Sequence, residues 1–286
     1  MNTHPDRLLI TAASARYGPS LLALLGSLSL NWPGHPPVLV YDIGLDTKTQ
    51  RALERHGVTV KHVPAFCPHW RQHYTWKIWC WDDAPARHVL WIDAGISVLQ
   101  PLDEIFDVIS DQGYFVVSNG MPLSVEASEA ACRGCGVEPA FRENRETLTA
   151  AVVGYDRQGP MNELLAEAMR VALVEEYIAA TTPEHRWEQA IFSLLMYRRF
   201  GEVRRADAAL YHGDRSPRQT PAPKIWLHRR GLRWRDRRHF IAHIGAAGAP
   251  HLPAAPAAWR SHLGLWRIRR WIGARFPALM YKGVHR

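Results

Sequence analysis

Short apolar runs alternate with helical patterns through the first part of the chain. Four apolar runs predict strands, at residues 7–14, 36–45, 58–65 and 88–95. The segments between them predict helices, at residues 18–32, 46–57 and 73–85. This order favours parallel strand pairing with helical crossovers. We therefore predict an α/β fold with a Rossmann-type nucleotide-binding sheet, whose ligands bind beyond the carboxyl ends of the strands.

The pattern changes after residue 95, which predicts a second half of different architecture. We predict strands at residues 113–120 and 148–157, a strand edge leading into a short helix at residues 97–109, and helices at residues 161–178 and 185–200. The polar, turn-rich stretch 121–146 predicts a loop. Residues 201–258 are rich in Arg, Pro and Ala and contain a predicted short strand at 239–245, and residues 259–286 alternate tryptophan with arginine.

Charge is distributed unevenly along the 286 residues. Residues 1–197 carry 15 Lys and Arg against 23 Asp and Glu, whereas residues 198–286 carry 20 against 4. Such an asymmetry indicates that the C-terminal third meets something anionic, such as membrane headgroups, nucleic acid or a phosphorylated substrate. The alternative is a basic surface that only aids solubility.

The sequence lacks the patterns of several common classes of protein. Cys132 and Cys135 form a lone CxxC without the further ligands that zinc needs, so we interpret them as loop thiols. The chain shows no signal-peptide pattern and no apolar stretch long enough to span a bilayer, so we predict a cytoplasmic protein. Neither GxGxxG after the first strand nor GxxxxGK[ST] occurs, which disfavours dinucleotide and P-loop sites.

Five polar residues are candidates for chemistry. Asp93 leaves a buried strand at its carboxyl end, where it could bind a divalent metal or merely cap a turn. His243, followed by small residues, could ligate Mn²⁺ or contact phosphate, although a histidine in a sheet is often structural. Glu188 and Gln189 begin a helix, where Glu188 could simply complement the helix dipole. Lys77 could reach an anion at the strand ends or remain solvated.

Taken in order, these residues resemble GT-A glycosyltransferases, nearest to family 8 and its bacterial relatives. The family's LDAD or LDSD strand end is similar to Trp91–Gly95, and its FNAGV strand to Leu148–Val152. Its DQD helix start is similar to Glu188–Ala190, and its late HFxG histidine to His243–Gly245. The resemblance covers residues 7–245.

The resemblance implies roles for individual residues. It implies donor binding by Thr11, Ala12, Lys77, Asp93, Thr149 and Ala150. It implies that Asp93 and His243 hold Mn²⁺ or Mg²⁺, and that Glu188 and Gln189 are catalytic. Two departures weaken the implied site. Gly95 replaces the second carboxylate of the motif, which weakens metal binding, and the lysine expected after the late histidine is absent. Leaving-group stabilisation would then rest on the metal, His243 and an arginine from 229–238.

The resemblance thus implies a nucleotide-sugar-dependent glycosyltransferase, with a UDP-linked donor and a cell-envelope glycan or lipid-linked acceptor. We expect a glycosyltransferase domain at 1–258 and a basic, Trp-rich tail at 259–286, whose composition suits contact with an anionic membrane surface. The tail could instead pack as a helix on the domain. Gly95 favours an alternative function, a non-catalytic relative that binds a nucleotide or glycan. We do not expect nucleic acid as a partner, because the basic region lacks a recognisable reading module.

Overall fold

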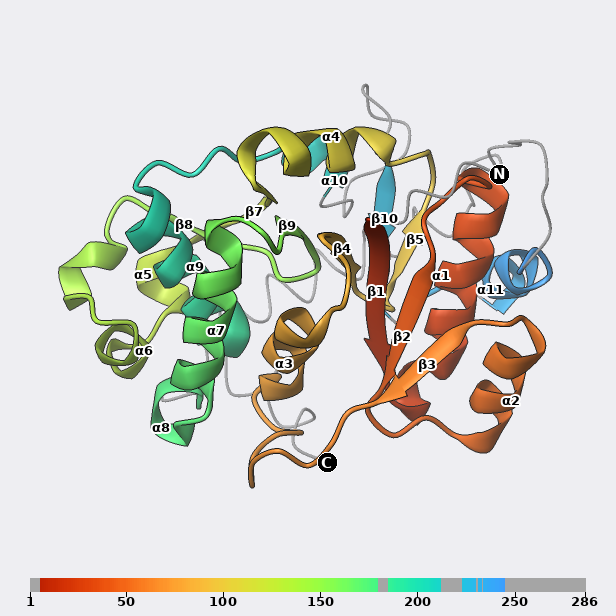
Figure 1. Cartoon of the computed structure of the whole chain (residues 1–286), viewed down its shortest axis with the longest axis horizontal. Coiled ribbons are helices and arrows are strands. Elements are labelled where there is room, and N and C mark those ends of the chain that lie inside the picture. The colour runs from red at the N-terminus through yellow and green to blue at the C-terminus, as the bar shows by residue number, and fades with distance from the viewer. Residues whose placement is uncertain (1–5, 180–184, 212–222, 230, 233, 245–286) are drawn as a thin grey trace.

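A six-stranded sheet organises the fold, with strand order β3-β2-β1-β4-β9-β6 (Figure 1). The structure is a computed structural model, and it describes residues 6–179, 185–211, 223–229, 231–232 and 234–244. The strands of this sheet are β1 (Arg7–Ala13), β2 (Val38–Asp42), β3 (Thr59–His62), β4 (His88–Ile92), β6 (Tyr114–Phe115) and β9 (Val152–Asp156). β3, β2, β1 and β4 are parallel, as the sequence predicts, whereas β9 runs antiparallel to both β4 and β6.

Helices cover both faces of this sheet. The principal ones are α1 (Gly18–Asn31), α2 (Thr47–Arg55), α3 (Thr75–Asp83), α4 (Asp103–Gln112), α7 (Pro160–Ala172) and α9 (Trp187–Phe200). Side chains of α3, α7 and α9 fill the core on one face, and those of α1 and α4 fill the core on the other. Successive residues of β1 alternate between these cores, with Leu9 and Ala13 on the α1 side and Ile10 and Ala12 on the α3 side. Burial on both faces explains why the parallel strands form continuous apolar runs.

Two small antiparallel pairs extend the sheet region. β5 (Ile96–Val98) follows β4 and pairs with β10 (Ile225–Leu227), which brings the late segment 223–229 beside the end of β4. β7 (Ser118–Pro122) pairs with β8 (Glu146–Leu148) around an irregularity in register. Two further short elements are η1 (Ala15–Tyr17), between β1 and α1, and α10 (Ala208–Tyr211), which precedes β10.

The predicted loop at 121–146 is wrong, because most of this stretch is ordered into short elements. It contains the end of β7, α5 (Leu123–Glu126), α6 (Glu129–Gly134), η2 (Pro139–Arg142) and the start of β8. Ser128 caps α6 by accepting a hydrogen bond from the Ala131 N–H. Cys132 and Cys135 are therefore not loop thiols. Both are free thiols buried in the core, and burial raises the pKa of each.

The predicted strand at 239–245 is also wrong, because α11 (Trp234–Ile241) occupies this region. α11 packs on α1, and only Phe240 of its residues is buried. A Cβ at Gly26 of α1 would lie 1.7 Å from the Phe240 carbonyl oxygen, so the helices meet where α1 has no side chain. One buried position in two turns explains why the apolar pattern did not indicate a helix.

Two smaller boundaries differ from the predictions. The strand expected at 148–157 is interrupted between β8 and β9, and the helix expected at 161–178 breaks into α7 and α8 (Glu175–Ile178). The tail at 259–286 lies outside the described residues. In the part of the chain that is described, no helix is long and apolar enough to cross a membrane.

Candidate active site

A buried lysine joins two acidic residues at the carboxyl end of β4. The Lys77 ammonium, on α3, lies 3.0 Å from Asp93 Oδ1 and 3.1 Å from Glu188 Oε1. The side chains of Lys77 and Glu188 are 4% and 6% exposed, whereas that of Asp93 is 30% exposed. The structure thus brings together three of the predicted site residues, and Asp93 is the one that faces solvent. We call Lys77, Asp93 and Glu188 the charged triad.

The end of β4 holds Asp93 in place. The Trp91 indole Nε1 donates to Asp93 Oδ1 at 2.8 Å, and the Asp93 N–H donates to the Ala151 carbonyl at 2.9 Å. Trp91 itself is fully buried against α3 and α9 side chains. The carboxylate is therefore fixed from both its backbone and its side chain.

Aromatic rings enclose the Lys77 ammonium. It lies 5.3 to 5.9 Å from the ring centroids of Tyr74, Trp76 and Trp91, a range in which a ring face attracts a cation. Trp187, which begins α9, contacts Tyr74 with ring centroids 5.3 Å apart. Tyr74 and Trp187 have φ values of 57° and 35°, a backbone region that non-glycine residues rarely adopt. Such strained residues cluster at functional sites.

Burial and charge set the protonation of the triad. Burial alone would lower the pKa of Lys77, but the Asp93 and Glu188 carboxylates outweigh burial and raise it above its usual range. Burial raises the pKa of Glu188 to about 7, and the Lys77 ammonium limits that rise. Glu188 can therefore gain or lose a proton near neutral pH, which suits an acid–base or nucleophilic carboxylate.

The strand interruption between β8 and β9 is bonded to the first turns of α9. Gln189 Oε1 accepts a hydrogen bond from the Ala150 N–H at 2.9 Å, and the Ala150 carbonyl lies 3.4 Å from Lys77 Nζ. The Thr149 hydroxyl accepts from the Ala151 N–H at 3.2 Å. The Ala150 backbone thus lies beside the charged triad. The side chains of Thr149 and Ala150 are buried. Gln189 acts in this structure as a positioning residue.

Thr11 and Ala12, the predicted donor contacts on β1, are both buried. The Thr11 hydroxyl has no hydrogen-bond partner among the described residues. Both lie on a strand adjacent to β4, but no described contact joins their side chains to the charged triad.

The place of the missing second carboxylate is filled by backbone. A Cβ at Gly95 would lie 2.7 Å from the Arg229 Cα and 3.1 Å from its carbonyl oxygen. The His228 and Arg229 N–H groups both donate to the Gly95 carbonyl, at 3.0 and 2.7 Å. No side chain at position 95 could therefore point a carboxylate at a metal without moving this turn.

His243 lies in the turn that follows α11, the helix that packs on α1, and its Nδ1 is 2.7 Å from the His239 carbonyl. Within the described ranges, no three His, Cys, Asp or Glu side chains are grouped to hold a metal ion. The structure does not bring His243 to Asp93. Because Asp93 Oδ1 is already bonded to Lys77 and Trp91, the residues present do not fit the metal site that the resemblance implies.

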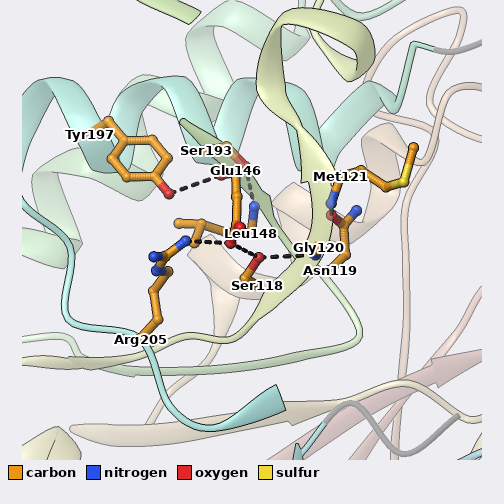
Figure 2. A network of polar contacts seen from close by, with 9 residues as sticks. All are labelled: Ser118, Asn119, Gly120, Met121, Glu146, Leu148, Ser193, Tyr197 and Arg205. Atoms are coloured by element: carbon orange, nitrogen blue, oxygen red, sulfur yellow. Dashed lines mark hydrogen bonds and ion pairs between the residues drawn. The ribbon is translucent and has the colours of Figure 1, made fainter. Parts of the chain in front are cut away.

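A second polar cluster lies on β7 and β8 (Figure 2). Glu146 Oε2 accepts from the Ser118 hydroxyl and from Arg205, each at 2.5 Å, and the Tyr197 hydroxyl donates to the Glu146 carbonyl at 2.8 Å. The Arg205 and Glu146 side chains are 39% and 48% exposed. We call these residues the Glu146 cluster.

Known structures share this arrangement of strands and helices. The bifunctional glycosyltransferase WbbM matches with a TM-score of 0.57 and 14% identity, over 91% of this chain and 52% of that chain. The galactosyltransferase LgtC, solved in complex with donor and acceptor sugar analogues, matches with a TM-score of 0.51 and 16% identity, over 90% of this chain and 100% of that chain. The glycosyltransferase GlyE of Streptococcus pneumoniae matches with a TM-score of 0.51 and 13% identity, over 94% of this chain and 64% of that chain.

The chain has the GT-A glycosyltransferase fold. The fold class predicted from the sequence is thereby confirmed. The chain spans about half the length of WbbM. No family model matches the sequence, and no curated protein matches it significantly. In this GT-A fold the charged triad lies beyond β4, at the sheet edge where ligands of open α/β sheets bind.

Sequence reasoning missed two residues beside the charged triad. Tyr74 and Trp187 give no signal in the sequence for their contact, because they lie on different helices. For Arg229 the sequence indicated only an arginine from 229–238, and the pairing of β10 with β5 is what brings this residue beside Gly95.

Proposed function

We propose that this protein transfers a sugar from a nucleotide-sugar donor, UDP-linked, to a cell-envelope glycan or lipid-linked acceptor. The observation that carries this proposal is the charged triad at the carboxyl end of β4 in a GT-A fold. The basic C-terminal third suits acceptors or membranes that bear negative charge. The protein then works at the inner face of the cell membrane, with its tail on anionic lipid.

In this proposal the members of the triad have different roles. Asp93, the exposed member, lies against the donor, and Glu188 lies deeper, beside the sugar carbon that changes bonds. Glu188 with a pKa of about 7 can act as a base or stabilise positive charge that develops at that carbon. Lys77 is too buried to reach the donor directly, so it positions the two carboxylates and balances their charge.

A metal ion forms no part of the steps proposed here. The resemblance implies Mn²⁺ or Mg²⁺, but the residues around Asp93 do not fit a protein-held ion. The assay below is therefore run both with and without added metal.

The proposal is tested by measuring UDP release from a panel of UDP-sugars by the full chain. Wild type should release UDP from at least one donor, and Asp93→Asn should lower that rate by at least 100-fold. Glu146→Gln is the matched control, because it neutralises an exposed carboxylate whose bonds within the described residues are with Ser118 and Arg205 and not with the charged triad. If Asp93→Asn keeps the wild-type rate, the site is wrongly assigned.

A second function, that of a non-catalytic nucleotide- or glycan-binding relative, is favoured by Gly95. That residue removes a carboxylate that the family resemblance leads us to expect. Calorimetric titration separates the two functions. Binding of UDP without turnover of any donor supports the binding protein, whereas turnover supports the transferase.

A further inference from the structure

The backbone of Arg229 begins where the family's second acidic side chain would begin. The Arg229 Cα lies 2.7 Å from the position that a Cβ on Gly95 would take. Among the described residues, the Arg229 side chain is exposed and has no bonding partner. A cationic residue therefore lies next to the position at which the family motif places an anionic one.

The turn that carries Arg229 is held firmly. Besides the two bonds to the Gly95 carbonyl, the Ser20 hydroxyl of α1 donates to the Arg229 carbonyl at 3.2 Å. His228 is buried and its Nε2 lies 3.1 Å from the Ser97 hydroxyl of β5. Arg229 has a φ of 56°, in the left-handed region. Non-glycine residues keep such a conformation only where the surroundings over-determine it, and this occurs most often at functional sites.

The neighbouring charges favour an arginine here over a metal. Asp93 Oδ1 is engaged by the Lys77 ammonium and the Trp91 indole. The backbone of Arg229 leaves no room for a second carboxylate at position 95. A guanidinium presents a fork of N–H donors that matches phosphate oxygens in a bidentate manner, and it supplies the positive charge that a divalent ion would otherwise bring to a leaving diphosphate.

We propose that Arg229 binds the diphosphate of the nucleotide-sugar donor, and that this site holds its donor without a protein-bound divalent metal. The inference rests on the proposed function, because it concerns how the same donor is held. It makes Arg229 a donor-binding residue, contributed by the basic C-terminal third to an edge otherwise built from the first part of the chain.

The test is calorimetric titration of UDP and UMP into the full-length protein, in EDTA and again with Mn²⁺ or Mg²⁺. Wild type should bind UDP with the same Kd, within about twofold, under all three conditions. Arg229→Gly should weaken UDP binding by at least 10-fold and UMP binding much less. Glycine accepts the left-handed φ at this position, so the variant removes the guanidinium without straining the turn. The Kd of Arg229→Lys for UDP should lie between those of wild type and Arg229→Gly.

Arg235→Ala is the matched control, since it removes another exposed arginine from the same basic region. It should bind UDP as wild type does. UDP binding that requires metal, or an Arg229→Gly variant that binds UDP like wild type in EDTA, would overturn the inference and leave the proposed function standing. Absence of UDP binding with and without metal would count against the inference and the proposed UDP-dependent function together.

Discussion

The charged triad and the Glu146 cluster are both built from acidic and basic side chains that link separate elements, yet they differ in burial. Lys77 and Glu188 are almost completely excluded from solvent, whereas Glu146 and Arg205 are more than a third exposed. The Glu146 cluster even has the shorter contacts, at 2.5 Å against 3.0 and 3.1 Å. Short distances alone do not distinguish a reactive group from a surface network.

The difference lies in what each cluster would do if one partner were lost. An exposed ion pair contributes little because water solvates either charge alone. A buried charge without its partner is costly, and burial also moves the pKa of a carboxyl towards neutrality. The charged triad is therefore the place where one substitution changes both stability and chemistry. The substitutions below separate the two regions, from the largest expected effect to the smallest.

Lys77→Met should have the largest effect. It leaves Glu188 buried without its cation, which costs about 3–5 kcal/mol of unfolding free energy. The measurement is urea unfolding at pH 8, where Glu188 is ionised in the wild type. Lys61→Met is the control, because Lys61 pairs with Asp83 at 2.7 Å but is 48% exposed, and it should cost less than about 1 kcal/mol. Equal losses in both variants would remove the distinction between buried and exposed pairs.

Glu188→Gln should lower kcat/KM by about 100-fold or more, since it removes the group proposed to act at the sugar carbon. In wild type, kcat/KM should rise with pH through about 7 as Glu188 loses its proton. The remaining kcat/KM of the Gln variant should not rise with pH in this range. A variant with an unchanged pH profile would exclude Glu188 as the titrating group.

The Glu188 carboxyl also makes the free energy of unfolding depend on pH. Because its folded-state pKa is raised, from 4.5 to about 7, the folded protein holds this proton where the unfolded chain has lost it. The resulting stabilisation is full below pH 4.5 and is lost as the pH rises through about 7. Comparing unfolding free energies of wild type and Glu188→Gln across this window should show wild type losing stability relative to the variant. A constant difference would show that the pKa is unshifted.

Gly95→Asp, which restores the family motif, should destabilise the protein by about 1–3 kcal/mol through overpacking against Arg229. It should not create metal-dependent UDP release. Gly34→Asp is the matched control, because a Cβ at Gly34 would meet nothing within 4 Å. The measurement is thermal unfolding of both variants. A Gly95→Asp protein as stable as wild type would show that the turn at Arg229 can move to accommodate the new side chain.

Arg205→Ala should have the smallest effect, less than about 1 kcal/mol in unfolding free energy, because its pair with Glu146 is exposed. High salt should reduce this loss further. A loss comparable with that of Lys77→Met would mean that the Glu146 cluster supports the fold more than its exposure indicates.

The parallel half of the fold was predictable because β1, β2 and β4 are buried runs and because capping signals bound α2. Asp46 caps α2 by accepting a hydrogen bond from the Thr49 N–H at 2.7 Å. α6 was missed although Ser128 and Glu129 carry an N-terminal signature, because the stretch is short and polar overall. α11 was missed because its single buried position leaves no period to detect.

For the site, residue types were predictable and contacts were not. An acidic residue at the end of an apolar strand pointed to Asp93, and the resemblance to a family pointed to Lys77 and Glu188. Their direct contact depends on how α3 and α9 pack against β4, which spacing along the chain does not encode. The close approach of Gly95 and Arg229 depends on strand pairing between distant segments, which no local pattern reveals.

The pairing of β10 with β5 also bears on the order in which the molecule is made. Asp93, Lys77 and Glu188 all leave the ribosome before residues 223–229 are synthesised. Domains fold as units during synthesis, but here the partner strand of β5 and the turn against Gly95 arrive late. A nascent chain that stops short of β10 would carry the charged triad without the turn that contains Arg229, so the proposed contact of Arg229 with the donor would form only after residues 223–229 have been synthesised.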